Sequence, residues 1–174
     1  EGARRRSAGG PRLLSATARI APLDPIACHA AGAALGMETS LWLQPEANLA
    51  LVALGTAWTV EESGPDRFRD VARAWAALVA DALVDGDADD GIDDRSGGRP
   101  AGPLLLGGFG FWPEPTRSAA WAGFESARLS LPALLVSITP GGTWLTASAV
   151  REPDRGWDSA ARRRAADLTA RWGV

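Results

Sequence analysis

The chain has 174 residues, of which 46% are hydrophobic, and it carries a formal net charge of −3 with a pI of about 5.2. This size predicts a single domain with its own core, and the acidic balance excludes the broad basic surface that is typical of nucleic-acid-binding proteins. Apolar runs stay well short of the roughly 20 residues that cross a bilayer, and no export signal follows the first arginines, so we expect no membrane partner and a cytoplasmic location.

Two residue types are scarce in a way that limits the chemistry. Cys28 is the only cysteine, which rules out an intramolecular disulfide. All 18 basic residues are arginines, so the chain contains no lysine. A Schiff base, a lysine general base and a phosphate-loop lysine are therefore excluded within these residues.

The first predicted elements are a strand and a short helix. We expect residues 1–16 to be a flexible segment, residues 17–174 to form one α+β domain, and residues 17–23 to form its first strand. A helix over 26–35 is predicted because its start and stop signals agree. These signals are Asp24 as N-cap, Pro25 as first helical residue and Gly36 just past the end. Cys28 and His29 lie on this helix and are interpreted as ordinary, partly buried residues, because no second histidine completes a metal or acyl-transfer set.

Three short strands and a long helix come next. Residues 40–44, 48–54 and 56–61 are rich in Leu, Val and Trp and are interrupted by proline or glycine, which predicts antiparallel strands. A capping box from Ser63 to Asp66 predicts the start of a helix that continues to about residue 84. The apolar stripe of this helix predicts a buried face: Phe68, Val71, Ala72, Trp75, Leu78, Val79, Ala82 and Leu83.

An acidic stretch follows at residues 85–102 and is predicted to be a mobile surface loop. It holds six aspartates and five glycines. A calcium loop is not supported, because Gly91 falls one place late and Ser96 stands where a bidentate glutamate is needed.

The run from Leu104 to Trp112, LLLGGFGFW, is predicted to be the central strand of the domain, buried on both faces. Gly108 and Gly110 share one face of that strand, so we expect another layer of backbone to approach closely there. After a loop carrying Trp121 and Phe124, residues 134–138 and 144–149 flank a TPGG turn and predict a hairpin. A final amphipathic helix is predicted over residues 158–172.

No catalytic, cofactor-binding or metal-ligating residue can be assigned from motifs. GxGxxG fails because Pro113 occupies its third glycine position, and GxSxG, HExxH and CxxC do not occur. The scattered glutamates do not form a pair that spacing alone identifies. The residues by themselves therefore predict an α+β domain without a visible active site.

Three segments together resemble a known family. In order they read SLWLQPEANLALVALGTAWTVEESGPDRF, LLLGGFGFWPEP and WAGFESARLSLPALLVSI. They are similar to the N-terminal half of isochorismate synthases, within the chorismate-utilising enzymes that include anthranilate and aminodeoxychorismate synthases. The resemblance covers residues 17–149, and its most specific part is Gly107 to Phe111 together with the Trp121, Phe124, Leu131 and Pro132 series.

The resemblance implies a fold and a reaction. The implied fold stacks two antiparallel sheets orthogonally between helical layers. In the implied reaction, Mg²⁺ holds the carboxylate of chorismate while a lysine general base and a glutamate general acid exchange a hydroxyl group for water. In the family these residues and the metal ligands lie in the C-terminal half, so none is carried over to this chain. We therefore expect a catalytically silent N-terminal part whose partner is the chorismate-binding C-terminal half.

Other interpretations stay open. Within the family, the chain could instead come from an anthranilate or aminodeoxychorismate synthase. Because the anthranilate branch binds inhibitory tryptophan near this region, Phe111 and Trp112 are weak candidates for an effector contact. From another class, the chain could be a stand-alone binding module. If the chain is one half of a larger enzyme, an apolar face should be uncovered, and two copies of the chain could form a homodimer through that face.

Overall fold

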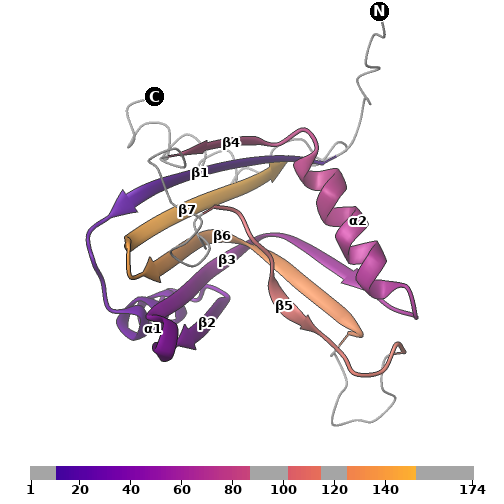
Figure 1. The fold of residues 1–174 in the computed structure, drawn as a ribbon, viewed down its shortest axis with the longest axis horizontal. Coiled ribbons are helices and arrows are strands. Elements are labelled where there is room, and N and C mark those ends of the chain that lie inside the picture. The colour runs from indigo at the N-terminus through magenta and orange to yellow at the C-terminus, as the bar shows by residue number, and fades with distance from the viewer. Residues whose placement is uncertain (1–10, 87–101, 115–124, 152–174) are drawn as a thin grey trace, which may run out of the picture.

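The computed structural model describes residues 11–86, 102–114 and 125–151. These residues form one seven-stranded sheet with two α-helices and one short 3₁₀ helix (Figure 1). The α+β class is therefore confirmed. In chain order the elements are β1 (Arg12–Ile20), α1 (Pro25–Ala34), β2 (Thr39–Gln44), η1 (Pro45–Ala47), β3 (Leu49–Glu62), α2 (Arg67–Val79), β4 (Leu83–Gly86), β5 (Leu106–Phe109), β6 (Ala127–Thr139) and β7 (Gly142–Arg151).

The sheet is mixed and not purely antiparallel. Its strands follow the order β2-β3-β6-β7-β1-β4, and β5 branches off this path by pairing with β6. Every pair is antiparallel except β1 with β4, which is parallel. The expectation of an antiparallel sheet is thus wrong at this one edge. The long connection that a parallel pair requires is supplied by the elements from α1 to α2, which lie between β1 and β4 in the chain.

Strand β1 begins earlier than the sequence predicted. It starts at Arg12, and its register with β7 runs without interruption from the pair Arg12 and Arg151 to the pair Ile20 and Thr143. The prediction that residues 1–16 form a flexible segment is therefore wrong for residues 12–16. Their alternation of buried and exposed side chains, with Leu13 fully buried, is that of a strand inside a sheet.

Strand β3 replaces two predicted strands. The sequence suggested a break at Gly55, but the strand continues through it to Glu62. Gly55 has a φ of 63°, and the register with β6 shifts between Thr56 and Trp58. A glycine with positive φ can absorb such an irregularity within a strand, so the chain bends there instead of stopping.

Helix α1 forms as its start and stop signals predicted. The Asp24 carboxylate accepts a hydrogen bond of 2.7 Å from the Ala27 amide, Pro25 opens the helix, and Gly36 follows its end with a φ of 72°. The helix lies close to β3, since a Cβ added to Gly32 would be 2.5 Å from Leu54 Cδ2. The small residue thus lets α1 cover the adjoining face of β2 and β3.

Helix α2 is shorter than predicted and begins differently. It ends at Val79, and Leu83 belongs to β4 because that segment pairs with β1. Asp66 is the N-cap but makes no capping bond, since its carboxylate pairs instead with Arg69 at 2.7 Å. The predicted capping box is therefore wrong in its bonding, although the helix starts within one residue of the expected position.

The core forms where α2 lies on the sheet. Leu13, Leu78, Leu131 and Val150 pack together, with Trp75 partly buried against them. A neighbouring cluster joins Val60, Val71 and Ala127. The predicted stripe is correct at Val71 and Leu78, but Phe68 is wrong as a core residue because it is 53% exposed.

The segment Leu104 to Trp112 is not a buried central strand. Only Leu106–Phe109 is a strand, it pairs with β6 alone, and Phe111 and Trp112 are 87% and 66% exposed. By contrast, the predicted hairpin is confirmed as β6 and β7, both longer than expected. The helix over 158–172, the loop with Trp121 and Phe124, and most of the acidic loop lie outside the described residues.

Candidate functional site

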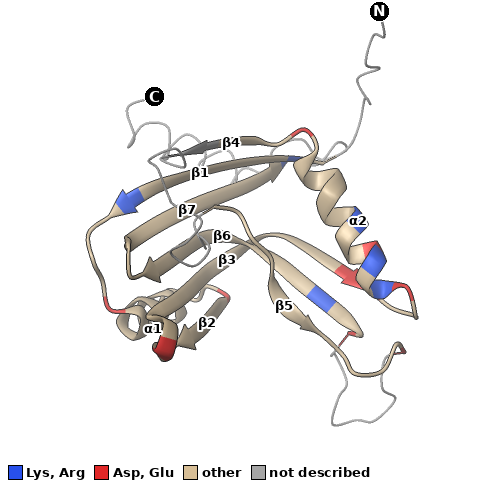
Figure 2. Ribbon diagram, in the orientation of Figure 1, with Lys and Arg blue, Asp and Glu red and all other residues tan. Residues whose placement is uncertain are grey.

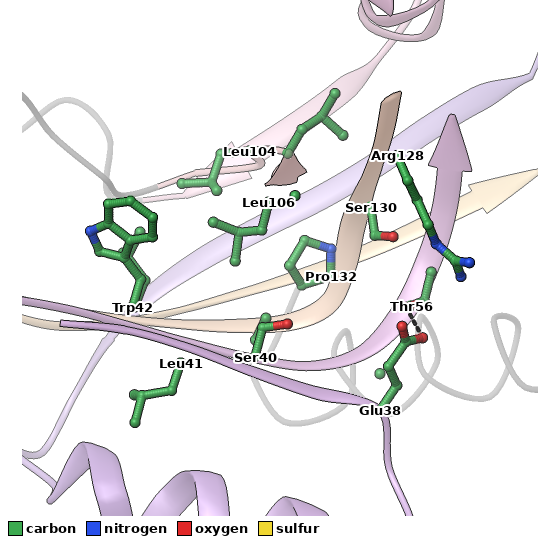
Figure 3. Close-up of a pocket in the computed structure, with 15 residues that line it drawn as sticks. Glu38, Ser40, Leu41, Trp42, Thr56, Leu104, Leu106, Arg128, Ser130 and Pro132 are labelled. Atoms are coloured by element: carbon green, nitrogen blue, oxygen red, sulfur yellow. Dashed lines mark hydrogen bonds between the residues drawn. The ribbon is translucent and has the colours of Figure 1, made fainter. Parts of the chain in front are cut away.

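The candidate site is a pocket of about 670 Å³ between β2, the bend of β3 and the segment 104–107 (Figure 3). Strand β6 forms its remaining wall through Arg128, Ser130 and Pro132. β5 pairs with the edge of β6 that is opposite to β3. Residues 104–107, which lead into β5, line the pocket together with residues of β2 and the first half of β3.

Most of the pocket lining is apolar. Alternation along β2 directs Ser40 and Trp42 toward the pocket and Leu41 toward the helix on the other side (Figure 3). The paired residues Leu51 and Ala53 of β3 lie beneath them, only 8% and 7% exposed. Leu104, Leu105, Leu106 and Pro132 complete the apolar lining.

One end of the pocket is polar, and its groups pair with one another or with side chains next to the pocket. The Thr56 hydroxyl donates to Glu38 Oε2 at 2.7 Å. The hydroxyl oxygens of Ser130 and Thr59 are 3.2 Å apart, within hydrogen-bonding distance. Arg128 forms an ion pair of 3.3 Å with Glu61, and both side chains are about half exposed. This end therefore supplies polar contacts, but its arrangement shows no activated nucleophile or acid and base pair.

Gly107 allows the segment that lines the pocket to lie close against the backbone of β6. A Cβ added there would overlap the Arg128 carbonyl oxygen and lie 2.8 Å from Leu129 Cα, and its φ is 153°. The close backbone contact in this segment is therefore at Gly107, and it is made with β6, the paired strand of the same sheet, and not with a further layer. At Gly108 the prediction is wrong, because nothing lies within 4 Å of an added Cβ, and at Gly110 the Ser126 backbone is only in ordinary contact at 3.5 Å.

A buried arginine ties the end of β5 to α2. Arg67 is 6% exposed, and its guanidinium donates to the carbonyl oxygens of Gly64 at 3.2 Å and Gly110 at 3.0 Å. The guanidinium also lies 4.5 Å from the centroid of the Phe68 ring, which stacks on Phe109 at 4.3 Å. The sequence patterns missed this role because they assigned Phe68 to the core and did not single out Arg67.

Phe111 and Trp112 do not line the pocket. They contact each other edge to face at 5.2 Å and are largely exposed. The effector contact that the resemblance suggested for these two residues stays a prediction, and the sequence analysis did not single out Trp42 as a pocket residue. The available signal was the alternation of Ser40, Trp42 and Gln44 in β2, but no pattern shows which segment folds over that face.

Cys28 and His29 are partly buried residues of α1, as predicted. His29 Nε2 is 3.1 Å from the Thr39 hydroxyl, which joins α1 to β2. Partial burial raises the pKa of the Cys28 thiol above its usual value and so disfavours the reactive thiolate. Within residues 11–86, 102–114 and 125–151, no three His, Cys, Asp or Glu side chains lie together as a metal site would require.

Charge and hydropathy add two further observations. Acidic and basic residues alternate around the start of α2 and the adjoining ends of β3 and β6 (Figure 2).

None of the helices in the described ranges is long and apolar enough to cross a membrane.

Comparisons with known proteins agree on one family. The family model described as chorismate binding enzyme matches residues 2–171. The salicylate biosynthesis isochorismate synthase of Pseudomonas aeruginosa is 34% identical over 126 residues, which are 72% of this chain and 23% of that protein. The isochorismate synthase MenF of Bacillus subtilis is 28% identical over 137 residues, 77% of this chain and 28% of that protein. The chain thus spans about a quarter of the length of these curated relatives, and no solved structure matches it.

Proposed function

Because the chain belongs to the chorismate-binding enzyme family, we propose that it is the N-terminal, non-catalytic part of an isochorismate synthase. The complete enzyme would convert chorismate to isochorismate. The observation that carries this proposal is the similarity to two curated relatives that have this activity in their names. This chain covers only about a quarter of the length of each relative.

The absence of lysine supports a non-catalytic role. The family resemblance implies a lysine general base, and this chain has none. It also implies Mg²⁺ bound by glutamates, whereas the described residues do not offer a cluster of three potential ligands. We therefore assign the base, the acid and the metal ligands to the remainder of the enzyme and derive no catalytic step from these residues.

The contribution of this part would be structural. The seven-stranded sheet, with α1 and α2 packed on it, would form one side of the orthogonal sheet stack that the resemblance implies. Such a stack needs an apolar surface on each sheet, and the lining of the pocket between β2 and residues 104–107 provides one.

Two alternatives differ in measurable ways. A component of anthranilate or aminodeoxychorismate synthase would require glutamine or ammonia for turnover, whereas isochorismate synthase requires neither. A stand-alone binding module would be stable without any further polypeptide and would leave chorismate unchanged in every combination.

The test compares two purified proteins under the same conditions. The 174-residue chain and the product of the complete reading frame that contains it are each incubated with chorismate and Mg²⁺, and isochorismate is measured. We expect product only from the complete protein, with loss on chelation of the metal. Turnover by the 174-residue chain alone would refute the non-catalytic role, and an inactive or glutamine-dependent complete protein would refute isochorismate synthase.

A further inference from the structure

Two buried polar atoms near the end of β5 have no hydrogen-bond partner among the residues that the structure describes. They are Nε of Arg67, a residue that is 6% exposed, and Oγ of Ser126, a residue that is 2% exposed. A buried polar group without a partner costs free energy, and in folded proteins it commonly marks the place of a bound water or ion. The two atoms therefore point to a ligand at this place.

Both residues belong to one hydrogen-bonded group around Gly110, which we call the Gly110 node. The Gly110 amide donates to the Ser126 carbonyl oxygen at 2.8 Å, and the Gly110 carbonyl oxygen accepts from Nη2 of Arg67 at 3.0 Å. The Gly64 amide donates to the Pro113 carbonyl oxygen at 2.7 Å. The node thus joins the residues after β5 to the turn before α2 and to the residue before β6 (Figure 1).

No ion pair joins Arg67 to a carboxylate within the described ranges. Its guanidinium donates to the carbonyl oxygens of Gly64 at 3.2 Å and of Gly110, and it lies 4.5 Å from the centroid of the Phe68 ring. These three partners are neutral, whereas a buried charge is costly unless an opposite charge accompanies it. A water molecule would satisfy Nε and leave the charge unbalanced, so the node favours an anion.

The acidic residues at the start of α2 already have partners. Asp66 pairs with Arg69 at 2.7 Å, and Asp70 pairs with Arg73 at 2.9 Å. Each of these carboxylates is matched by an arginine of the same helix. Neither is therefore left to balance the charge of Arg67.

The N-terminus of α2 adds to the attraction for an anion. Arg67 is the first residue of this 13-residue helix, and its guanidinium contacts Gly64 in the preceding turn, so the charged group lies at the helix N-terminus. The N-cap residue Asp66 makes no capping hydrogen bond with its side chain. The amides and the dipole at the start of a helix favour negative charge.

We propose that the Gly110 node binds one small monovalent anion of the halide class, held by Nε of Arg67, Oγ of Ser126 and the first turn of α2. A halide accepts from N–H and O–H donors, and the burial of both side chains excludes larger anions. The node is distinct from the pocket between β2 and residues 104–107, whose lining includes neither residue. The bound anion would hold the residues after β5 against α2, whatever reaction the complete protein performs.

Thermal unfolding of the 174-residue chain tests this site. Sodium chloride replaces sodium gluconate at constant ionic strength, because gluconate is too large for a buried site and general screening then stays fixed. An anion that binds only the folded chain stabilises it, so we expect the unfolding temperature to rise with chloride and to reach a plateau. An unfolding temperature that does not change with chloride would overturn the proposal.

Matched variants locate the effect. Arg67→Met should abolish the dependence on chloride, whereas Arg69→Met should keep it, because Arg69 is on the same turn but its side chain is 73% exposed. Equal loss of the dependence in both variants would mean a surface effect and would overturn the proposal. Since Arg67→Met also removes two hydrogen bonds within the chain, a variant that keeps the arginine is needed as well.

Ser126→Ala is that variant, and the sign of its effect is informative. With no ligand, the change removes a buried hydroxyl that lacks a partner, so the unfolding temperature should stay the same or rise at every chloride concentration. With a bound anion, it removes one donor, so we expect the chloride concentration at half-effect to increase about tenfold. An unchanged chloride midpoint would overturn the proposal.

Bromide identifies the position directly. Crystals grown in sodium bromide should give an anomalous peak beside Nε of Arg67 and Oγ of Ser126. Density without anomalous signal at this place would show an ordered water, and bromide peaks only elsewhere would show an adventitious ion only. Either result would overturn the proposal, and neither depends on whether isochorismate is formed.

Discussion

The β6–β7 hairpin and the segment Leu104 to Trp112 are both strongly apolar, yet only the hairpin contributes fully buried residues to the core. Leu131 and Leu135 of β6 are 0% and 2% exposed, whereas Phe111 is 87% exposed. The difference lies in their neighbours, because β6 pairs with β3 over residues 127–138 and with β7 over residues 134–139, whereas β5 pairs with β6 alone. An apolar run thus indicates that a segment needs covering, but not which part of the polypeptide covers it.

The largest expected contrast is between side chains of these two regions. Leu131→Ala should lower the free energy of unfolding by about 2–5 kcal/mol, because it opens a cavity among Leu13, Leu78 and Val150. Phe111→Ala should change it by less than about 0.5 kcal/mol, since that ring is mostly in water. Urea unfolding followed by circular dichroism measures both. Similar losses for the two variants would mean that the segment 104–112 belongs to the core after all.

The glycines of β5 give the next contrast. Gly107→Ala should cost about 1–3 kcal/mol, because its φ of 153° and the adjacent Arg128 carbonyl leave no place for a Cβ. Gly108→Ala is the matched control, with nothing within 4 Å of the new methyl group, and should be neutral or slightly stabilising. Unfolding midpoints and amide exchange at residues 127–130, which pair with β5, test the pair. Equal effects would contradict the close approach at Gly107.

A smaller effect is expected where β1 meets β7. The hydroxyl oxygens of Ser15 and Ser148 are 3.1 Å apart and buried. Ser15→Ala alone should cost about 1–2 kcal/mol by leaving the Ser148 hydroxyl without its partner. Changing both to alanine should recover most of that loss, so a double-mutant cycle on unfolding free energies measures the coupling. Strictly additive losses would show that the two hydroxyls do not interact.

The smallest contrast concerns the two helix starts. Asp24→Ala should destabilise the chain by about 1 kcal/mol, because the carboxylate caps the Ala27 amide. Asp66→Ala should cost less than about 0.5 kcal/mol, since Asp66 makes only an exposed ion pair with Arg69. Thermal unfolding of both variants side by side is sufficient. A larger loss at Asp66 would restore the capping box predicted from sequence.

The sequence correctly predicted those elements that are determined by residues close to one another in the chain. Asp24 and Pro25 determine the start of α1, and the TPGG turn determines the hairpin, so both were found. The position of β4 was missed because its pairing with β1 joins residues about 70 apart, and apolar residues at its start also fit the end of a helix. The burial of Arg67 was missed for the same reason, since its partner Gly110 is 43 residues away.

The candidate site was the least predictable part. Leu104 to Leu106 stood out in the sequence, but their place beside Trp42 in the pocket lining depends on β5 pairing with β6 instead of occupying the centre of the sheet. No periodicity encodes that choice. The family resemblance was predictable because it rests on the order of motifs, and it was confirmed without any active-site residue.

The place of β7 in the sheet has a consequence for biosynthesis. β7 lies between β6 and β1, so the last described strand to leave the ribosome joins β1 and β4 to the group formed by β2, β3 and β6. A nascent chain that ends before about residue 142 therefore holds two sets of strands that are not hydrogen-bonded to each other and that have open edges. Such edges attract other chains, and assembly that waits for distant residues is slow. We expect this domain to depend on chaperones during translation until Gly142–Arg151 has emerged.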